Sequence, residues 1–113
     1  MTVEKRPWGT YEVLDEGKNY RVKKITIYPE QRFSKQLHRY RKEYWTFVSG
    51  YGEATINKTV TLIRPGTSMI VEKEDIHRVS NRCEDINLVI IETQIGKCDE
   101  DDIIRIEDDY ERV

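Results

Sequence analysis

The chain has 113 residues, of which 35% are charged and 37% hydrophobic, and its mean hydropathy is −0.75. This length suffices for one hydrophobic core and is too short for two, so we expect a single domain spanning residues 1–113. Nineteen basic and 21 acidic residues leave a formal charge of −2, which favours neither nucleic acid nor an anionic membrane as a partner.

Short runs rich in β-branched and aromatic residues predict an all-β fold. In chain order, the expected strands are 9–14, 20–27, 34–38, 43–49, 53–56, 60–63, 68–71, 77–80 and 86–94. Turn-forming residues separate them, and the pair Asn57-Lys58 predicts a tight hairpin. A short helical turn is expected at 99–103, because acidic residues favour a helix start. Many short strands in a chain of this length imply a β-sandwich or a small barrel that holds a ligand in its mouth.

The sequence carries no recognisable targeting or membrane signal. Its first residues lead into Pro7-Trp8-Gly9 without an apolar stretch of the signal-peptide type. No apolar run approaches the roughly 20 residues that cross a bilayer. Cys83 and Cys98 lie far apart and outside any Cys-x-x-Cys arrangement, so neither a disulfide framework nor a zinc knuckle is expected. We therefore expect a cytoplasmic protein.

The stretch 36–45 concentrates polar, chemically capable side chains between two apolar runs. Alternate residues of a strand project to one face, so Gln36, His38 and Tyr40 are expected to lie together. Glu43 would join them after a bend. Imidazole, carboxylate and amide groups in such a cluster predict a site for a metal ion or a small polar ligand.

The other histidine of the chain, His77, follows a second β unit that begins at Pro65-Gly66. Two β units that each bring one histidine inward are typical of a metal-holding jelly roll. Charge is also uneven along the chain, since 32–42 is basic and 98–109 is acidic. A basic segment inside a pocket suits an anionic small molecule such as a phosphate ester, and a solvated surface is the alternative.

In four segments the chain resembles the cupin superfamily, and more narrowly the C-terminal cupin domain of bifunctional mannose-1-phosphate guanylyltransferase/type II mannose-6-phosphate isomerase. Arg6-Pro7-Trp8-Gly9 is similar to that domain's entry motif, and 36–45 is similar to its Gln-x-His-His-His-Arg-x-Glu-His-Trp motif. Residues 66–81 resemble the second cupin motif, and 100–112 resemble the closing motif. The match is collinear over nearly the whole chain. It implies a small cupin-type jelly-roll β-barrel with a short C-terminal extension, and a stand-alone cupin because no guanylyltransferase domain is present.

The chain departs from the family pattern within the motifs that hold the metal. Where the first motif has histidines, this chain has Arg39, Tyr40 and Tyr44, and Tyr40 takes the position of the second histidine ligand. Glu72 and Glu74 replace the proline and glycine usual before the second-motif histidine. The fold expected from the resemblance does not depend on these positions, whereas the metal site does.

The resemblance implies interconversion of mannose 6-phosphate and fructose 6-phosphate with one divalent metal ion. Zinc, manganese, cobalt, nickel and iron are not distinguished. Residues with nitrogen or oxygen donors would hold the ion: His38, His77, Glu43 and Gln36. The catalytic group would comprise Glu43, Arg41 and Tyr40. A phenol has a pKa of about 10, so Tyr40 is better suited to hydrogen-bond a sugar hydroxyl than to bind a metal.

The substrate would be held by guanidinium groups, which bind phosphate in bidentate fashion, and by an indole that can stack on a sugar ring. The candidates are Arg6, Trp8, Arg105 and Arg112. Arg41 is a further candidate for the phosphate, and at least two of these four arginines are expected in structural ion pairs because of the acidic tail.

Two other hypotheses stay open. The first is a non-catalytic cupin that binds a sugar phosphate or a nucleotide sugar, which the tyrosine at position 40 favours. The second is a β-domain with a structural or protein-interaction role. A homodimer is expected by analogy, since cupins pair through exchanged or abutting edge strands.

Overall fold

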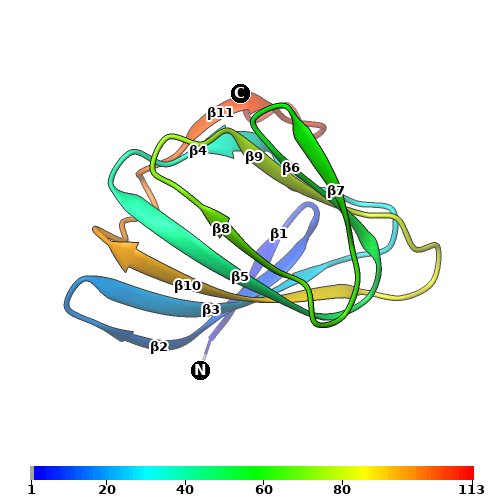
Figure 1. The fold of residues 1–113 in the computed structure, drawn as a ribbon, viewed down its shortest axis with the longest axis horizontal. Helices are drawn as coiled ribbons and strands as arrows, with labels where there is room; N and C mark the ends of the chain where they lie inside the picture. Colours follow the sequence, from blue (N-terminus) through cyan, green and yellow to red (C-terminus); the bar gives the residue numbers. More distant parts are fainter. Residues whose placement is uncertain (1) are drawn as a thin grey trace.

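The computed structural model describes residues 2–113, and every regular element within them is a β-strand. The strands are β1 (Val3–Arg6), β2 (Gly9–Gly17), β3 (Tyr20–Ile27), β4 (Lys35–Leu37), β5 (Arg41–Ser49), β6 (Gly52–Ile56), β7 (Thr59–Ile63), β8 (Ser68–Val71), β9 (His77–Asn81), β10 (Leu88–Gly96) and β11 (Ile104–Glu107). They form two antiparallel sheets, ordered β1-β2-β3-β10-β5-β8 and β11-β4-β9-β6-β7, which face each other as the two walls of a jelly roll (Figure 1). The expected all-β jelly-roll fold is confirmed. The described residues contain no helix of the length and apolarity needed to cross a membrane.

The nine predicted strands are all present, with ends moved by at most three residues, and 20–27 and 68–71 match β3 and β8. Two strands were missed, β1 and β11. Each lies at the edge of its sheet, and most of its residues are exposed, so neither shows a burial pattern in the sequence. The helical turn expected at 99–103 is instead a single hydrogen-bonded turn, in which Asp102 N donates to Asp99 O at 3.1 Å.

Aromatic and aliphatic side chains fill the space between the two sheets. Phe33 packs edge-on against both Trp8 and Trp45, with ring centroids 5.8 and 6.3 Å away. Trp45 and Phe47 are each only 1% exposed, and they are inward-facing neighbours on β5. Buried aromatic rings of this size contribute the largest share of a small core.

The inward faces of two neighbouring central strands, β3 and β10, change from apolar to polar toward the same end of the barrel. Along β3 the buried residue Ile25 is followed by Lys23, and along β10 the buried residue Ile90 is followed by Glu92. Lys23 and Glu92 are cross-strand partners. Polar side chains buried at one level of a barrel need partners there, which makes this end the place for a functional site.

Candidate metal centre and its cavity

A cavity of about 130 Å³ lies at the polar end of the barrel. Trp8 and Phe33 form part of its apolar wall. The polar residues that line it come from both sheets and from the segments on either side of β11: Arg6, Lys23, Gln36, His38, Arg41, Glu43, His77, Glu92, Glu100, Arg105 and Arg112. Most of the residues predicted from the sequence as site residues therefore share one cavity.

Three buried side chains with metal-ligating atoms meet in this cavity: His38, Glu43 and His77. One donor atom from each lies within 4.8 Å of the others. Glu43 Oε2 is 3.4 Å from His38 Nε2, and Glu43 Oε1 is 3.7 Å from His77 Nε2. Glu43 belongs to β5 of the larger sheet, whereas His77 begins β9 and His38 follows β4 in the smaller sheet.

Backbone carbonyls fix the orientation of both imidazoles. His38 Nδ1 lies 2.5 Å from Asp102 O, and His77 Nδ1 lies 2.8 Å from Asp75 O. A carbonyl oxygen only accepts, so the ring proton sits on Nδ1 and each Nε2 presents its lone pair toward Glu43. Burial lowers the pKa of both imidazoles, to about 4 for His38, where the cation of Arg41 adds to the effect.

A neutral imidazole that is oriented through Nδ1 and carries a lone pair on Nε2 is the form in which histidine binds a metal ion. Together with the carboxylate of Glu43 they make a donor set that fits a divalent cation of the zinc, manganese or iron type. Gln36 also lines the cavity and is the cross-strand partner of His77 in the smaller sheet. Its amide nitrogen donates to Ser34 O at 3.3 Å, which leaves its amide oxygen available as a neutral donor.

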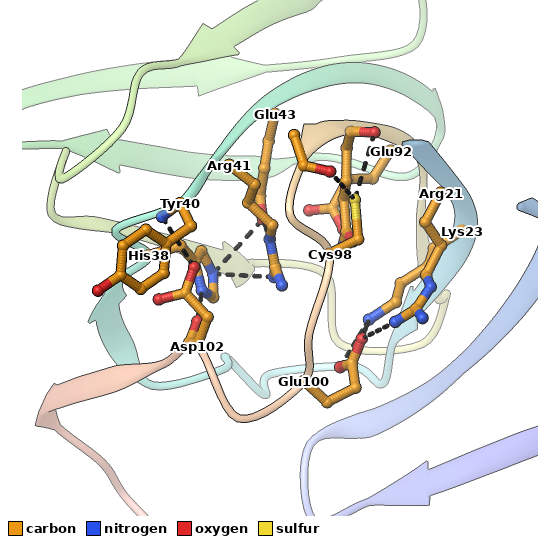
Figure 2. A network of polar contacts seen from close by, with 12 residues as sticks. Arg21, Lys23, His38, Tyr40, Arg41, Glu43, Glu92, Cys98, Glu100 and Asp102 are labelled. Atoms are coloured by element: carbon orange, nitrogen blue, oxygen red, sulfur yellow. Dashed lines mark hydrogen bonds and ion pairs between the residues drawn. The ribbon is translucent and has the colours of Figure 1, made fainter. Parts of the chain in front are cut away.

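The guanidinium of Arg41 engages two of the three donor groups. Its Nε donates to Glu43 Oε2 at 2.9 Å, and its Nη2 lies 3.2 Å from His38 Nε2 (Figure 2). Its Nη1 donates to Asp99 O at 3.2 Å. Hydrogen bonds with a charged donor and a charged acceptor are strong, so an ion that binds all three donor groups must displace this side chain.

Tyr40 does not lie with the donor groups, and the expectation that it projects beside Gln36 and His38 is wrong. The chain bends at 39–40 after β4, so the strand alternation stops there. The side chain of Tyr40 is 55% exposed and is absent from the cavity lining. Its amide instead donates to the Asp102 carboxylate at 2.9 Å (Figure 2). Tyr44, at the other changed histidine position, also faces outward from β5.

Sequence reasoning missed Glu92, a buried acid on β10. It accepts hydrogen bonds from Trp45 Nε1 at 2.9 Å and from Gln94 Nε2 at 2.8 Å. Burial and then the neighbouring carboxylate of Glu43 raise the pKa of Glu92 to about 7. Strand alternation was the available signal, since Glu92 falls on the same inward face as Ile90.

Three guanidinium groups gather at another part of the cavity wall. Arg105 Nε is buried and has no hydrogen-bond partner among residues 2–113. Burial and the nearby charge of Arg112 lower the pKa of Arg105. Arg6 Nη2 donates to Tyr11 Oη at 3.3 Å, and Arg112 pairs with Asp108 at 2.7 and 3.0 Å. A buried donor without a partner inside a cationic cluster is suited to an anionic ligand.

Sequence comparison finds a family profile and several relatives that match nearly the whole of this chain. The profile of the family described as "Mannose-6-phosphate isomerase C-terminal" matches residues 2–108. The mannose-1-phosphate guanylyltransferase ManC of Salmonella typhimurium is 39% identical over 109 residues, which are 96% of this chain and 22% of ManC. The alginate biosynthesis protein AlgA of Pseudomonas aeruginosa is 41% identical over 108 residues, 95% of this chain and 22% of AlgA. The chain thus spans less than a quarter of the length of these relatives.

Solved structures with the same fold include an RmlC-like cupin from Shewanella frigidimarina and the capsular polysaccharide assembling protein CapF from Staphylococcus aureus. The RmlC-like cupin has a TM-score of 0.79 at 17% identity, and the aligned part covers 88% of this chain and 86% of the cupin chain. CapF has a TM-score of 0.80 at 15% identity, and the aligned part covers 94% of this chain and 34% of the CapF chain. At these identities the likeness concerns the fold alone. With the profile match over 2–108, it follows that the chain belongs to the mannose-6-phosphate isomerase C-terminal family and has the cupin fold.

Proposed function

We propose that this chain interconverts mannose 6-phosphate and fructose 6-phosphate and uses one divalent metal ion. The observation that carries the proposal is the orientation of His38 and His77, whose neutral Nε2 atoms point to Glu43 inside the cavity. The same cavity contains Arg105 Nε, which has no hydrogen-bond partner among residues 2–113. A metal-ligating group and an anion-binding group in one cavity are what a metal-dependent sugar-phosphate enzyme needs.

Aldose–ketose isomerisation moves a proton between two adjacent carbons. It requires a proton carrier, stabilisation of the enediolate oxygen and an anchor for the phosphate. A divalent ion held by His38, Glu43 and His77, with Gln36 as a further oxygen donor, would supply the electrophilic stabilisation. The carboxyl groups of Glu43 and Glu92 face the same space and are the groups suited to carry the proton.

The remaining candidates bind the sugar phosphate. Arg105 is the first anchor for the phosphate because its Nε has no partner among residues 2–113, and Arg6 and Arg112 add charge beside it. Trp8 offers an indole to the sugar at the apolar wall. Arg41 adds a fourth guanidinium, next to the donor groups, once it is released from Glu43.

A second function has its own support, that of a cupin that binds a sugar phosphate or a nucleotide sugar without catalysis. The observation in its favour is the guanidinium of Arg41, which engages both Glu43 and His38. A cation already held by the donor groups reduces the need for a metal ion. Metal content separates the two functions, because the binding protein would contain no bound metal as purified and would take up none from solution.

The test is an isomerase assay of the purified protein with added divalent metals, beside a His38→Ala/His77→Ala double variant. We expect turnover that a chelator abolishes and that the double variant lacks. A Glu43→Gln variant serves as the second probe, because it keeps the side-chain shape and removes the anionic donor. A wild-type protein with no turnover above the double variant would refute the isomerase.

We also propose a homodimer and a cytoplasmic location. The support for the dimer is the presence of unpaired sheet edges, since β1 and β8 end the larger sheet. Light scattering at micromolar concentration would measure the mass, and the mass of one chain would contradict the dimer.

A further inference from the structure

Lys23 of the cavity wall and its neighbour Arg21, which does not line the cavity, are already paired with an acid of the same chain. Lys23 Nζ lies 2.8 and 2.7 Å from the two carboxylate oxygens of Glu100, and Arg21 Nη1 lies 2.7 Å from one of them (Figure 2). Lys23 is only 5% exposed. A lysine charge this deeply buried needs an anion beside it, and Glu100 provides one.

Glu100 comes from the segment 97–103, which joins β10 to β11 and which we call the strap. The carboxylate of Asp102 accepts from the amides of Arg39 and Tyr40, both at 2.9 Å, and so ties the strap to the bend after β4. Asp99 O accepts from Arg41 Nη1 at 3.2 Å. These anchors on both sides of Glu100 direct its side chain into the cavity, toward Lys23 (Figure 2).

Glu100 is ionised in this position. Burial by itself would raise its pKa, but the charges of Lys23, Arg41 and Arg21 together bring the pKa of Glu100 below its ordinary value. The strap therefore holds a negative charge against Lys23 of the cavity wall and against the neighbouring Arg21.

There are two cationic groups at the cavity: Arg6, Arg105 and Arg112 form the first, and Lys23 with Arg21 forms the second. The two groups lie close to each other but differ in whether the carboxylate of Glu100 occupies them. Tyr11 is their common neighbour, since its ring centroid is 5.0 Å from Arg6 Cζ and 4.0 Å from Lys23 Nζ. On the Arg6 side, Arg105 Nε has no partner among residues 2–113, whereas on the Lys23 side the carboxylate of Glu100 already occupies the cations.

We propose that Glu100 determines specificity by filling the second cationic subsite, so that the cavity accepts sugar ligands with one phosphate and excludes those with two. A ligand with a second phosphate would have to bring it beside the carboxylate of Glu100 or displace that carboxylate from Lys23 and Arg21. Like charges placed together in this way are a usual means of rejecting a wrong ligand. This inference deepens the proposed function and rests on it for the identity of the first phosphate.

The test measures binding of fructose 6-phosphate and fructose 1,6-bisphosphate by calorimetry in metal-free buffer. Wild-type protein should bind the monophosphate at least about tenfold more tightly than the bisphosphate, because like charges meet at Glu100. Glu100→Gln removes the charge and should bring the two affinities together or reverse their order. Glu16→Gln is the matched control, because Glu16 pairs with Arg21 at 3.0 Å but does not line the cavity.

A Glu100→Gln protein that keeps the wild-type preference would overturn the inference, as would a wild-type protein that binds both sugars equally. Glu100→Ala, compared by thermal unfolding, guards against a variant that fails to fold. If wild-type protein binds neither sugar phosphate, even with an added divalent metal, the proposed function is refuted. Inorganic pyrophosphate then decides the inference separately: tighter binding to Glu100→Gln than to wild type supports it, and equal binding overturns it.

Discussion

Replacement of Arg41 by methionine should strengthen metal binding and weaken the metal-free fold. In the structure, Arg41 donates to Glu43 Oε2 at 2.9 Å and lies 3.2 Å from His38 Nε2. A hydrogen bond to a charged group contributes about 1.5–3 kcal/mol, and a metal ion must break at least one such bond to reach its donor atoms. Since about 1.4 kcal/mol is a factor of ten, removal of the guanidinium should tighten metal binding at least tenfold.

The same substitution leaves Glu43, which is 2% exposed, without its cationic partner. Breaking a buried ion pair from one side costs roughly 3–5 kcal/mol, so the metal-free variant should be less stable by about that amount. Added metal should restore most of the loss, because the ion then neutralises the carboxylate.

The assay is a competition titration of zinc or manganese against a chelator, together with urea unfolding with and without metal. Arg39→Met is the matched control, because Arg39 is exposed and adjacent to the same bend. An Arg41→Met protein that binds metal no more tightly than wild type would show that the guanidinium does not compete for the donor groups.

Three further predictions concern the core, the buried acid and the phosphate anchor. Trp45→Ala should lower the free energy of unfolding by about 3–5 kcal/mol in urea, because the ring is 1% exposed, and a loss below about 1 kcal/mol would contradict its place in the core. The pKa of Glu92 is raised to about 7 from 4.5, so its stabilising contribution is complete below pH 4.5 and is lost as the pH rises through 7. Unfolding of Glu92→Gln between pH 4.5 and 8 should therefore show less of this decline than wild type, and identical pH profiles would argue against a raised pKa. Arg105→Ala should weaken binding of fructose 6-phosphate by about tenfold or more in calorimetry, whereas Arg39→Ala should not, and equal affinities would remove Arg105 from the site.

The positions of the central strands were predictable because their residues obey simple rules. In β3 and β8 the β-branched and aliphatic residues stop at recognisable turn residues, such as Pro29 after β3. β1 and β11 were not predicted, because an edge strand has one neighbour and buries little surface, which leaves polar residues at most positions. The strap formed a turn where a helix start was expected, since its acidic residues bind basic and amide groups elsewhere in the chain.

The residues of the candidate site also fall into those that the sequence could predict and those that it could not. Resemblance to two cupin motifs was enough to select His38, Glu43 and His77, which the structure brings together. The Tyr40 position was wrong because the bend at 39–40 depends on the carboxylate of Asp102, some 60 residues further along the chain. No pattern in the residues around position 40 predicts such a long-range contact.

Lys23 and Glu92 were within reach of sequence reasoning. Each is a charged residue placed two positions from a buried isoleucine, at an inward position of a strand. Had the inward faces of β3, β10 and β5 been aligned, both would have fallen at the level of Trp45, one inward position from Glu43. Pairing between strands, which the sequence does not display, is the missing information.

The three candidate ligands also have a mechanical consequence, because they come from opposite walls of the barrel. Glu43 is held by the larger sheet, and His38 and His77 by the smaller one. Any ligand that binds all three at once acts as a reversible cross-link between the walls, closing a loop that the unfolded chain cannot close without loss of entropy. The barrel would then resist separation of its two sheets in proportion to how tightly that ligand is held, so occupancy of the cavity and rigidity of the fold would rise and fall together.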